Sequence, residues 1–426
     1  MRILILNTYD LDGGAAAAAY RLHKGLQNSQ SGVEVNMLVA GKRRDDDSVI
    51  SLSAASSLKM RAFMIAEFTP ARLYTKRDRV SLFSPGMVST PNVLQTIKAL
   101  DPDIVHLHWL SGGFISINDI GKIGRPVVWT MHDMWPFTGG CHYDKYCGRY
   151  LNSCGSCPNL ASKRDSDISR WGFKQKEKAY SRLPSLTMVG PSRWITEEAK
   201  KSGLAHTYEA VNLPNPIDTK EFYPEDRLEA RQKLNLPVDC KLVLFGAFSA
   251  TSDPRKGFDL ASAALTRLEQ EVSRDGQSLE LVVMGAEPPE DKPNFPFETH
   301  YTGWIRDIDK MRTLYSAADV FLSPSRQENL SNMIVESMAC GTPVVSFDIG
   351  GNRDMIDHKE NGYLAKAFDT DDLAEGLAWV VNHKQETQVS QNAINKIFHQ
   401  FSEKVVIPRY LSLYKQILEH SNQLIR

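Results

Sequence analysis

The feature that most constrains the fold is an alternation of strands and helices that runs through the chain twice. Short apolar runs such as Ile3 to Leu6 and Leu279 to Met284 have the continuous hydrophobic pattern of strands buried on both faces. Helical segments such as Leu260 to Glu271 lie between these runs. This alternation predicts an α/β protein with parallel sheets and right-handed crossovers.

The alternation is interrupted once, near residue 215. The segment Val211 to Asp218 holds two prolines and two asparagines, which predicts an extended connector. A length of 426 residues also suits two domains. We therefore predict two doubly wound Rossmann-like domains facing a cleft, the first at 1–215 and the second at 216–403. In such sheets ligands bind at the carboxyl ends of the strands, so functional residues are expected in the loops that follow strands.

Charge and hydropathy exclude some classes of protein. Lys and Arg (50) nearly balance Asp and Glu (51), which argues against a protein that wraps nucleic acid. No run of about 18 apolar residues predicts a membrane span. The start, Met1 to Asn7, has the pattern of a buried strand rather than a signal peptide, so we expect a cytoplasmic protein.

The first group of candidate residues lies in the second half, between Ser323 and Val345. A predicted strand leads into a loop with Glu328, and a helix with a good N-cap near Ser331 carries Glu336. Helix N-termini bind phosphate, and carboxylates accept hydrogen bonds from sugar hydroxyls. The pattern suits a nucleotide sugar, although a capped helix with solvated glutamates would look the same.

The Glu-x7-Glu spacing, followed by Glu336 to Val345 (ESMACGTPVV), closely resembles the signature of the group-1 (family 4) retaining glycosyltransferases of the GT-B fold, including bacterial members that build polysaccharides. The resemblance is specific here and covers most of the chain less specifically. It implies transfer of a hexose from a UDP- or GDP-linked donor to a glycan or lipid-linked acceptor, with no catalytic metal. It also implies that a C-terminal helix at about 404–426 returns to the first domain.

The same resemblance implies roles for individual residues. Glu328 would contact the transferred sugar and Glu336 the ribose of the nucleotide. The backbone of three further residues would hold the sugar or the diphosphate: Asn329, Leu330 and Ser331. Ile305, in the segment His300 to Ile305, would lie near the base.

A loop after the first strand of the second domain agrees with this family. Lys256 and Gly257 match the family's Lys-Gly, and such a cation neutralises the leaving diphosphate. The family's Arg is replaced by Ala247, and Arg255 is the candidate that would supply the missing guanidinium. The alternative is that Arg255 and Lys256 are surface residues of a turn.

The first half is expected to hold the acceptor. Gly13 and Gly14 follow the first strand and would let a ligand approach the backbone. They do not form G-x-G-x-x-G, which disfavours a nicotinamide oxidoreductase. His132 ends a predicted strand, where the family has a histidine that contacts the donor sugar or the acceptor. His106 and His108 alternate on another strand, and we interpret them as structural.

Four cysteines are concentrated in one short stretch with the spacing C-x5-C-x6-C-x2-C: Cys141, Cys147, Cys154 and Cys157. The C-x2-C pair is typical of zinc sites. We predict a structural Zn²⁺, because four thiolates leave no open position for catalysis. Disulfides and free thiols are the alternatives.

The segment Ser57 to Phe83 mixes basic and apolar residues. One interpretation is a peripheral contact with anionic lipid at the inner face of a membrane, and the other is a solvated helix.

Two rival functions remain open from the sequence: a sugar-nucleotide epimerase on the same fold, and a non-catalytic, zinc-stabilised binding protein. An epimerase would release no glycoside, and a non-catalytic binding protein would keep its function without Glu328. A transferase should lose nearly all turnover without Glu328.

Overall fold

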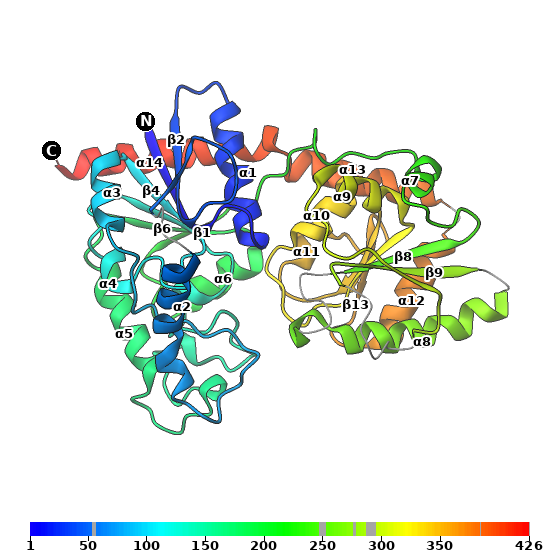
Figure 1. The fold of residues 1–426 in the computed structure, drawn as a ribbon, viewed down its shortest axis with the longest axis horizontal. Helices are drawn as coiled ribbons and strands as arrows, with labels where there is room; N and C mark the ends of the chain where they lie inside the picture. The colour runs from blue at the N-terminus through cyan, green and yellow to red at the C-terminus, as the bar shows by residue number, and fades with distance from the viewer. Residues whose placement is uncertain (53–56, 247–252, 276–277, 287–294, 384, 426) are drawn as a thin grey trace. The chain divides into compact units, whose positions relative to one another are not determined.

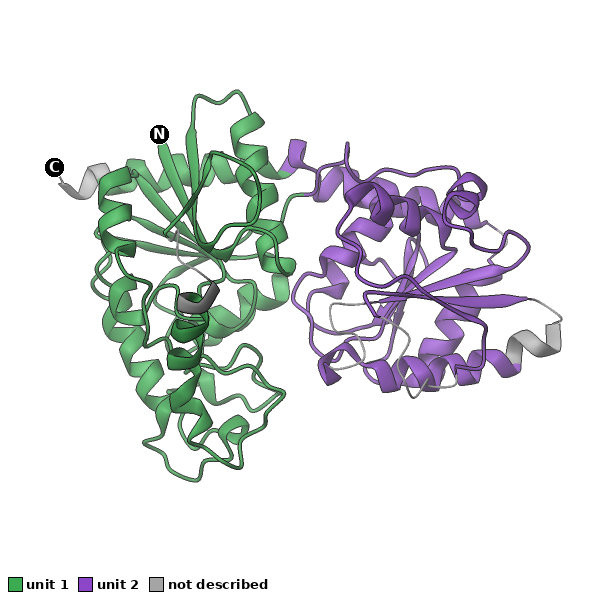
Figure 2. Cartoon of the chain, in the orientation of Figure 1, with its two compact units in different colours: residues 1–216, 406–426 green, residues 217–405 purple. Residues whose placement is uncertain are grey.

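The computed structural model describes residues 1–52, 57–246, 253–275, 278–286, 295–383 and 385–425. The chain divides into two compact units (Figure 2). Unit 1 comprises Met1–Pro216 with Val406–Arg426, and unit 2 comprises Ile217–Val405. The division falls within the connector that contains Pro214 and Pro216.

Unit 1 is built on a seven-stranded sheet with the order β3-β2-β1-β4-β5-β6-β7 (Figure 1). All of its strand pairs are parallel, and the strand order reverses between β1 and β4. The strands are β1 (Arg2–Tyr9), β2 (Glu34–Gly41), β3 (Val49–Ser51), β4 (Ile104–Leu107), β5 (Val127–Thr130), β6 (Leu186–Gly190) and β7 (Glu209–Asn212). The helices are α1 (Gly14–Asn28), α2 (Ser57–Arg72), α3 (Val93–Leu100), α4 (Ile117–Ile120), α5 (Ile168–Tyr180), α6 (Arg193–Lys201) and most of α14 (Glu403–Ile425).

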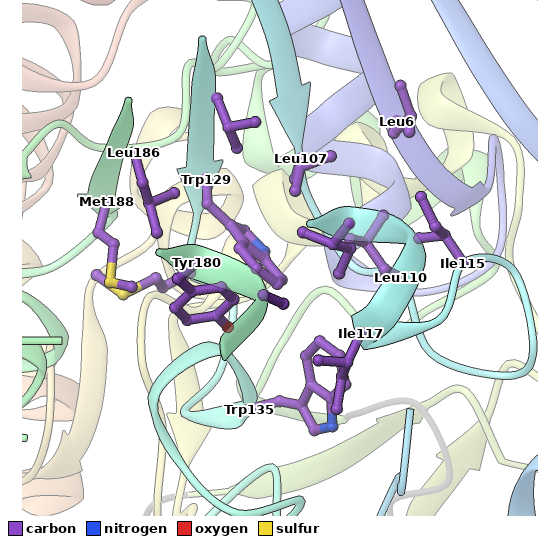
Figure 3. Packing of buried hydrophobic residues seen from close by; sticks show 14 of the residues in the cluster. Leu6, Leu107, Leu110, Ile115, Ile117, Trp129, Trp135, Tyr180, Leu186 and Met188 are labelled. Carbon is purple, nitrogen blue, oxygen red and sulfur yellow. The ribbon is translucent and has the colours of Figure 1, made fainter. Parts of the chain in front are cut away.

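Both faces of this sheet are covered. Along β1, Leu4 and Leu6 face one hydrophobic cluster, whereas Ile3 and Ile5 face another. This arrangement explains why the strand is a continuous apolar run rather than an alternating one. Figure 3 shows the first cluster, in which the indole of Trp129 meets the ring of Tyr180 edge-on with centroids 5.7 Å apart.

Helix α14 covers part of the second face. Its residues Tyr410 and Tyr414 are fully buried in the cluster that also contains Ile3 and Ile5. The hydroxyl of Tyr414 lies 2.7 Å from Nδ1 of His106, whose Nε2 lies 2.8 Å from the hydroxyl of Thr130. The C-terminal helix therefore contributes both apolar packing and a polar contact to the core of unit 1.

Unit 2 repeats this design with a six-stranded parallel sheet in the order β10-β9-β8-β11-β12-β13. The strands are β8 (Lys241–Gly246), β9 (Leu279–Met284), β10 (Thr299–Tyr301), β11 (Val320–Ser323), β12 (Val344–Phe347) and β13 (Gly362–Ala365). The helices are α7 (Arg227–Lys233), α8 (Phe258–Asp275), α9 (Ile308–Ala317), α10 (Asn332–Ala339), α11 (Asn352–Met355), α12 (Thr370–Val381) and α13 (Glu386–Gln400).

In unit 2 the strand order reverses between β8 and β11. Val243 and Phe245 face one cluster, and Leu242 and Leu244 face the other. The predicted α/β class, with two parallel doubly wound sheets, is confirmed. Among the described helices, none is both long and apolar enough to cross a membrane.

Several histidines are buried in unit 1, and their burial has a consequence for acid stability. Burial lowers the pKa of His106 to about 3, and it lowers the pKa of His23 and His132 to about 4. These rings are neutral in the folded protein at pH values where they would be protonated in the unfolded chain, whose histidines have a pKa near 6.5. Below that pH the unfolded state binds more protons, so stability falls as the pH falls.

We therefore expect the free energy of unfolding to decrease between about pH 7 and about pH 5.5, by about 1 kcal/mol for each of these histidines. Urea titrations at a series of pH values measure this loss. His106→Gln should reduce the pH dependence, whereas His206→Gln, at an exposed position, should not. A free energy of unfolding that is flat over this range would contradict the expectation.

Candidate functional site

The centre of the candidate site is a buried carboxylate in the loop after β11. Glu328 is buried, and Lys256 donates a hydrogen bond of 2.9 Å from Nζ to its Oε2. The guanidinium of Arg255 lies 3.7 Å from the same oxygen. Burial alone would raise the pKa of Glu328, but the positive charges of Lys256 and Arg255 outweigh it and hold the pKa below its usual value. Glu328 is therefore an anion between two cations.

These residues meet because β8 and β11 are neighbouring strands at the point where the strand order reverses. Lys256 and Arg255 lie in a 3-10 turn, Pro254–Lys256, whose first amide is capped by the carboxylate of Asp253. The amide of Arg326 donates to the carbonyl of Arg255 over 2.8 Å, which ties the two loops together. Ala247 lies outside the described residues.

Two glycines let other segments approach this loop closely. Gly257 has φ +70°, and a Cβ there would lie 2.0 Å from the carbonyl oxygen of Pro324. Gly350 has φ +50°, and a Cβ there would lie 2.0 Å from the carbonyl oxygen of Glu328. A larger residue fits at neither position without moving the backbone that carries Glu328.

Helix α10 starts directly after this loop. Ser331 occupies its N-cap position without capping the helix through its side chain, while Asn329 and Leu330 are buried just before it. The first-turn amides of a helix carry partial positive charge and can receive an anionic group. Glu328 and the predicted backbone contacts of Asn329, Leu330 and Ser331 thus lie on one continuous segment.

Glu336 and Ile305 both adjoin the hydrophobic cluster that contains Tyr315. Glu336 is only 3% exposed and accepts a hydrogen bond of 2.9 Å from the hydroxyl of Tyr315 on α9. Ile305 is half-buried and packs against the cluster that contains Tyr315. The ribose contact of Glu336 and the base contact of Ile305 stay predictions.

In unit 1, the turn after β1 is open. Gly13 occupies the N-cap position of α1 with φ +92°, and a Cβ at this position would meet no atom within 4 Å. Gly13 and Gly14 are both exposed. The turn therefore has room beside the start of a helix, and the ligand contact of Gly13 and Gly14 stays a prediction.

His132 follows β5 and is held by a second histidine. Nδ1 of His108 lies 2.8 Å from Nε2 of His132, and the two rings are stacked with centroids 5.1 Å apart. Burial lowers the pKa of both rings, that of His132 to about 4, so both are neutral near pH 7. The sequence interpretation of His108 as structural did not connect it to His132, although the two residues follow the neighbouring strands β4 and β5.

The remaining ring nitrogen of His108 indicates which tautomer is present. Within the described part of the chain, Nε2 of His108 is buried and has no hydrogen-bond partner. A buried unpaired N–H is rarer than an unpaired acceptor, so we assign the proton of His108 to Nδ1. His108 then donates to Nε2 of His132, which places the proton of His132 on Nδ1.

The four clustered cysteines are free thiols in this structure. Cys141 and Cys157 are buried in one small hydrophobic cluster, and Cys147 and Cys154 are half-buried. Burial raises the pKa of Cys154 to about 12 and that of Cys157 to about 11. Over the described ranges, no group of three or more His, Cys, Asp or Glu side chains is arranged to hold a metal ion. The zinc site therefore stays a prediction from the cysteine spacing.

Comparisons with known proteins agree with the geometry. The family described as "Glycosyl transferases group 1" matches residues 239–383, which include Lys256, Glu328 and Glu336. The family described as "Glycosyltransferase Family 4" matches residues 12–221. Each unit is thus covered by a glycosyltransferase family.

One relative is similar in sequence over most of the chain, and two solved structures have a similar fold. The D-inositol 3-phosphate glycosyltransferase of Saccharomonospora viridis is 24% identical over 420 residues, covering 92% of this chain and 87% of the relative. The structure of sucrose-phosphate synthase from Thermosynechococcus elongatus aligns with a TM-score of 0.65 at 19% identity, covering 98% and 99% of the two chains. Anabaena Alr3699/HepE in complex with UDP and glucose aligns with a TM-score of 0.60 at 17% identity, covering 97% and 99%.

The predictions of a transferase and of the GT-B fold are therefore confirmed, and the chain belongs to the group-1, family 4 glycosyltransferases.

Proposed function

We propose that this glycosyltransferase moves a hexose from a UDP- or GDP-linked donor to a hydroxyl group, with retention of the anomeric configuration. The observation that carries the proposal is the buried Glu328 between Lys256 and Arg255 at the reversal point of the second sheet. The carboxylate can accept hydrogen bonds from sugar hydroxyls, while the two cations and the start of the helix can bind a diphosphate. A nucleotide sugar carries both groups. The solved neighbour bound to UDP and glucose supports the choice of donor class.

In this proposal the two cations act on the leaving group. Lys256 and Arg255 stabilise the negative charge that develops on the diphosphate when the glycosidic bond breaks. The amides at the start of α10 contribute from the same segment. Glu328 accepts hydrogen bonds from the transferred sugar, while Glu336 contacts the ribose and Ile305 lies beside the base.

Retention follows from a front-face reaction. The bond between the anomeric carbon and the diphosphate oxygen breaks with both electrons going to the diphosphate. The acceptor oxygen then bonds to the same face of that carbon, and its proton passes to the leaving phosphate. Neutral His132, with its proton on Nδ1, contributes a hydrogen bond to the donor sugar or the acceptor rather than acting as an acid.

The acceptor in this proposal is a glycan or a lipid-linked glycan in polysaccharide biosynthesis, with the enzyme in peripheral contact with the inner face of a membrane. The open turn at Gly13 and Gly14 supplies room for the acceptor or its phosphate in unit 1. The mixed basic and apolar segment around α2 supports a lipid surface.

We propose separately that the four clustered cysteines hold a structural Zn²⁺. Backbone amides form hydrogen bonds to three of the sulfurs, which lower the pKa of those thiols against the effect of burial: Arg149 to Cys147, Gly139 to Cys154, and Asn159 and Leu160 to Cys157. Such N–H donors stabilise thiolates around a metal. The ion would order the loop and would take no part in the transfer.

Glu328→Gln tests the proposed function directly. Turnover of the nucleotide sugar should fall by at least about 100-fold, because the amide cannot accept hydrogen bonds at both atoms or balance Lys256 and Arg255. A coupled assay for released nucleoside diphosphate measures turnover, and a thermal-shift screen with UDP and GDP measures nucleotide binding.

Glu360→Gln, at an exposed turn of the same unit, is the matched control and should keep full turnover. The Glu328→Gln variant should still be stabilised by the same nucleotide as the unmodified protein. Undiminished turnover in Glu328→Gln, or no stabilisation of the unmodified protein by either nucleotide, would rule out the proposed roles.

Gly257→Ala should impair the same site through the backbone. Its φ of +70° costs an alanine about 1–2 kcal/mol. In addition, the new methyl group would displace the carbonyl of Pro324, 2.0 Å away, and with it the loop of Glu328. We expect reduced turnover and a lower midpoint of thermal unfolding.

Gly124→Ala separates these two effects. Gly124 has φ +68°, but a Cβ there would meet no atom closer than 3.9 Å. This variant should therefore show the conformational cost without the loss of turnover. Equal turnover in the two variants would mean that close packing at Gly257 does not position Glu328.

For the metal, elemental analysis of the purified protein should find about one zinc ion per chain, held by four thiolates. Removal of zinc by a chelator should lower the midpoint of thermal unfolding and expose Cys147, which is half-buried, to alkylation. Cys154→Ser should lose the zinc, whereas Cys240→Ser, in unit 2, should keep it. Purified protein without zinc whose clustered thiols all react would contradict the proposal.

A further inference from the structure

A cavity of about 150 Å³ lies in unit 1 between the end of α2 and the segment that follows it. Three of its lining residues are arginines: Arg72, Arg77 and Arg79. Its base includes Phe83, which is 4% exposed and pairs with Cys141 of the cysteine loop through an antiparallel bridge. The cavity therefore has a packed base.

The arginines of this cavity are not neutralised by the acidic residues nearest to them in sequence. Glu67 is buried, and its carboxylate accepts hydrogen bonds from the backbone amides of Gly86, Met87 and Val88. Asp78 accepts from the amide of Val80 and the hydroxyl of Ser81, and it pairs with Lys145.

Arg77 directs one nitrogen to the carbonyl oxygen of Asp78. Across the described residues, no ion pair engages Arg72, Arg77 or Arg79. Three positive charges around a small cavity, with the neighbouring carboxylates engaged elsewhere, favour an anion about the size of a phosphate group.

The rim of the cavity is apolar and exposed. Val80 and Leu82 line the cavity and are 55% and 43% exposed, and Leu73, which follows Arg72 in the sequence, is 76% exposed. Large apolar side chains that gather at the surface indicate contact with an apolar partner. A soluble phosphate would use the arginines but not these side chains, and a nucleic acid offers no alkyl chains. An acidic phospholipid presents both a phosphate and acyl chains.

We propose that Arg72, Arg77 and Arg79 bind the phosphate of an acidic phospholipid while Leu73, Val80 and Leu82 contact its acyl chains. This proposal names the residues that would make the peripheral membrane contact, and it rests on the membrane contact included in the proposed function. It does not depend on the transfer reaction, since binding requires neither donor nor acceptor.

The test is co-sedimentation of the full chain with vesicles. Vesicles of phosphatidylcholine mixed with phosphatidylglycerol should bind the protein, and vesicles of phosphatidylcholine alone should not. Binding should weaken with added salt. Arg72→Ser/Arg79→Ser should weaken binding by about 30-fold, because each basic side chain at an anionic surface contributes about fivefold. Leu73→Ser/Leu82→Ser should also weaken binding, but with less dependence on salt.

Lys98→Ser/Arg182→Ser removes the same charge at exposed positions elsewhere in unit 1 and is the matched control, expected to bind within about threefold of the unmodified protein. All of these residues are exposed, so the midpoints of thermal unfolding should be unchanged.

Equal weakening in the arginine variant and the control would overturn the proposal. So would full displacement of the vesicles by soluble glycerol phosphate, which would assign the cavity to a free phosphate, or equally tight binding of RNA, which would assign it to a nucleic acid. A chain that binds vesicles as expected but shows no transfer would leave this site standing and would refute only the transferase mechanism.

Discussion

Parallel sheets covered on both faces determine where this protein can place polar chemistry. In β1 and β8 successive side chains enter opposite hydrophobic clusters, so the middle of a strand has no room for a ligand. Side chains that can reach a ligand therefore lie in the loops at the carboxyl ends of the strands. The helices that follow neighbouring strands cover opposite faces of the sheet only where the strand order reverses, and this leaves space for a ligand there. Glu328 and Lys256 lie at that point in unit 2, and Gly13 and His108 lie there in unit 1.

Within this framework, the buried charge of Glu328 connects three loops. A carboxylate without partners would not stay ionised in such a buried position. The cations of the 3-10 turn stabilise the charge, the hydrogen bond from Arg326 to Arg255 fixes the turn, and Gly350 packs on the carbonyl of Glu328. The energetic cost of burying the carboxylate is thus offset by groups that a diphosphate would also need. Burial and ion pairing pre-organise the loops that we propose to bind the donor.

Sequence patterns predicted features that neighbouring residues in the chain determine, such as long apolar strands. They missed contacts that depend on how one strand is aligned with the next. The long apolar strands were predicted closely, with β9 at the exact bounds Leu279–Met284. Short, partly polar strands such as β7 carry too little periodicity to be detected. Resemblance to family motifs singled out Glu328 and Lys256, and the structure brings these two side chains into contact. The pairing of His108 with His132 depends on the alignment of β4 with β5, which no local pattern encodes.

The long segment between β5 and β6 forms a surface of unit 1 away from the carboxyl ends of the strands. Its turns place Lys145, Tyr146, Cys154 and Ser156 at positive φ, a conformation that only a well-supported loop retains. Part of the support is Lys176 of α5, which is fully buried, donates to the carbonyl of Thr138 and lies 3.7 Å over the ring of Trp135. The same segment supplies Cys141, on which Phe83 and the arginine cavity rest. This support comes from the loop and α5 rather than from the strand ends. The lipid surface that we propose for the cavity lined by Arg72, Arg77 and Arg79 would therefore not compete with a ligand bound at the carboxyl ends of the strands.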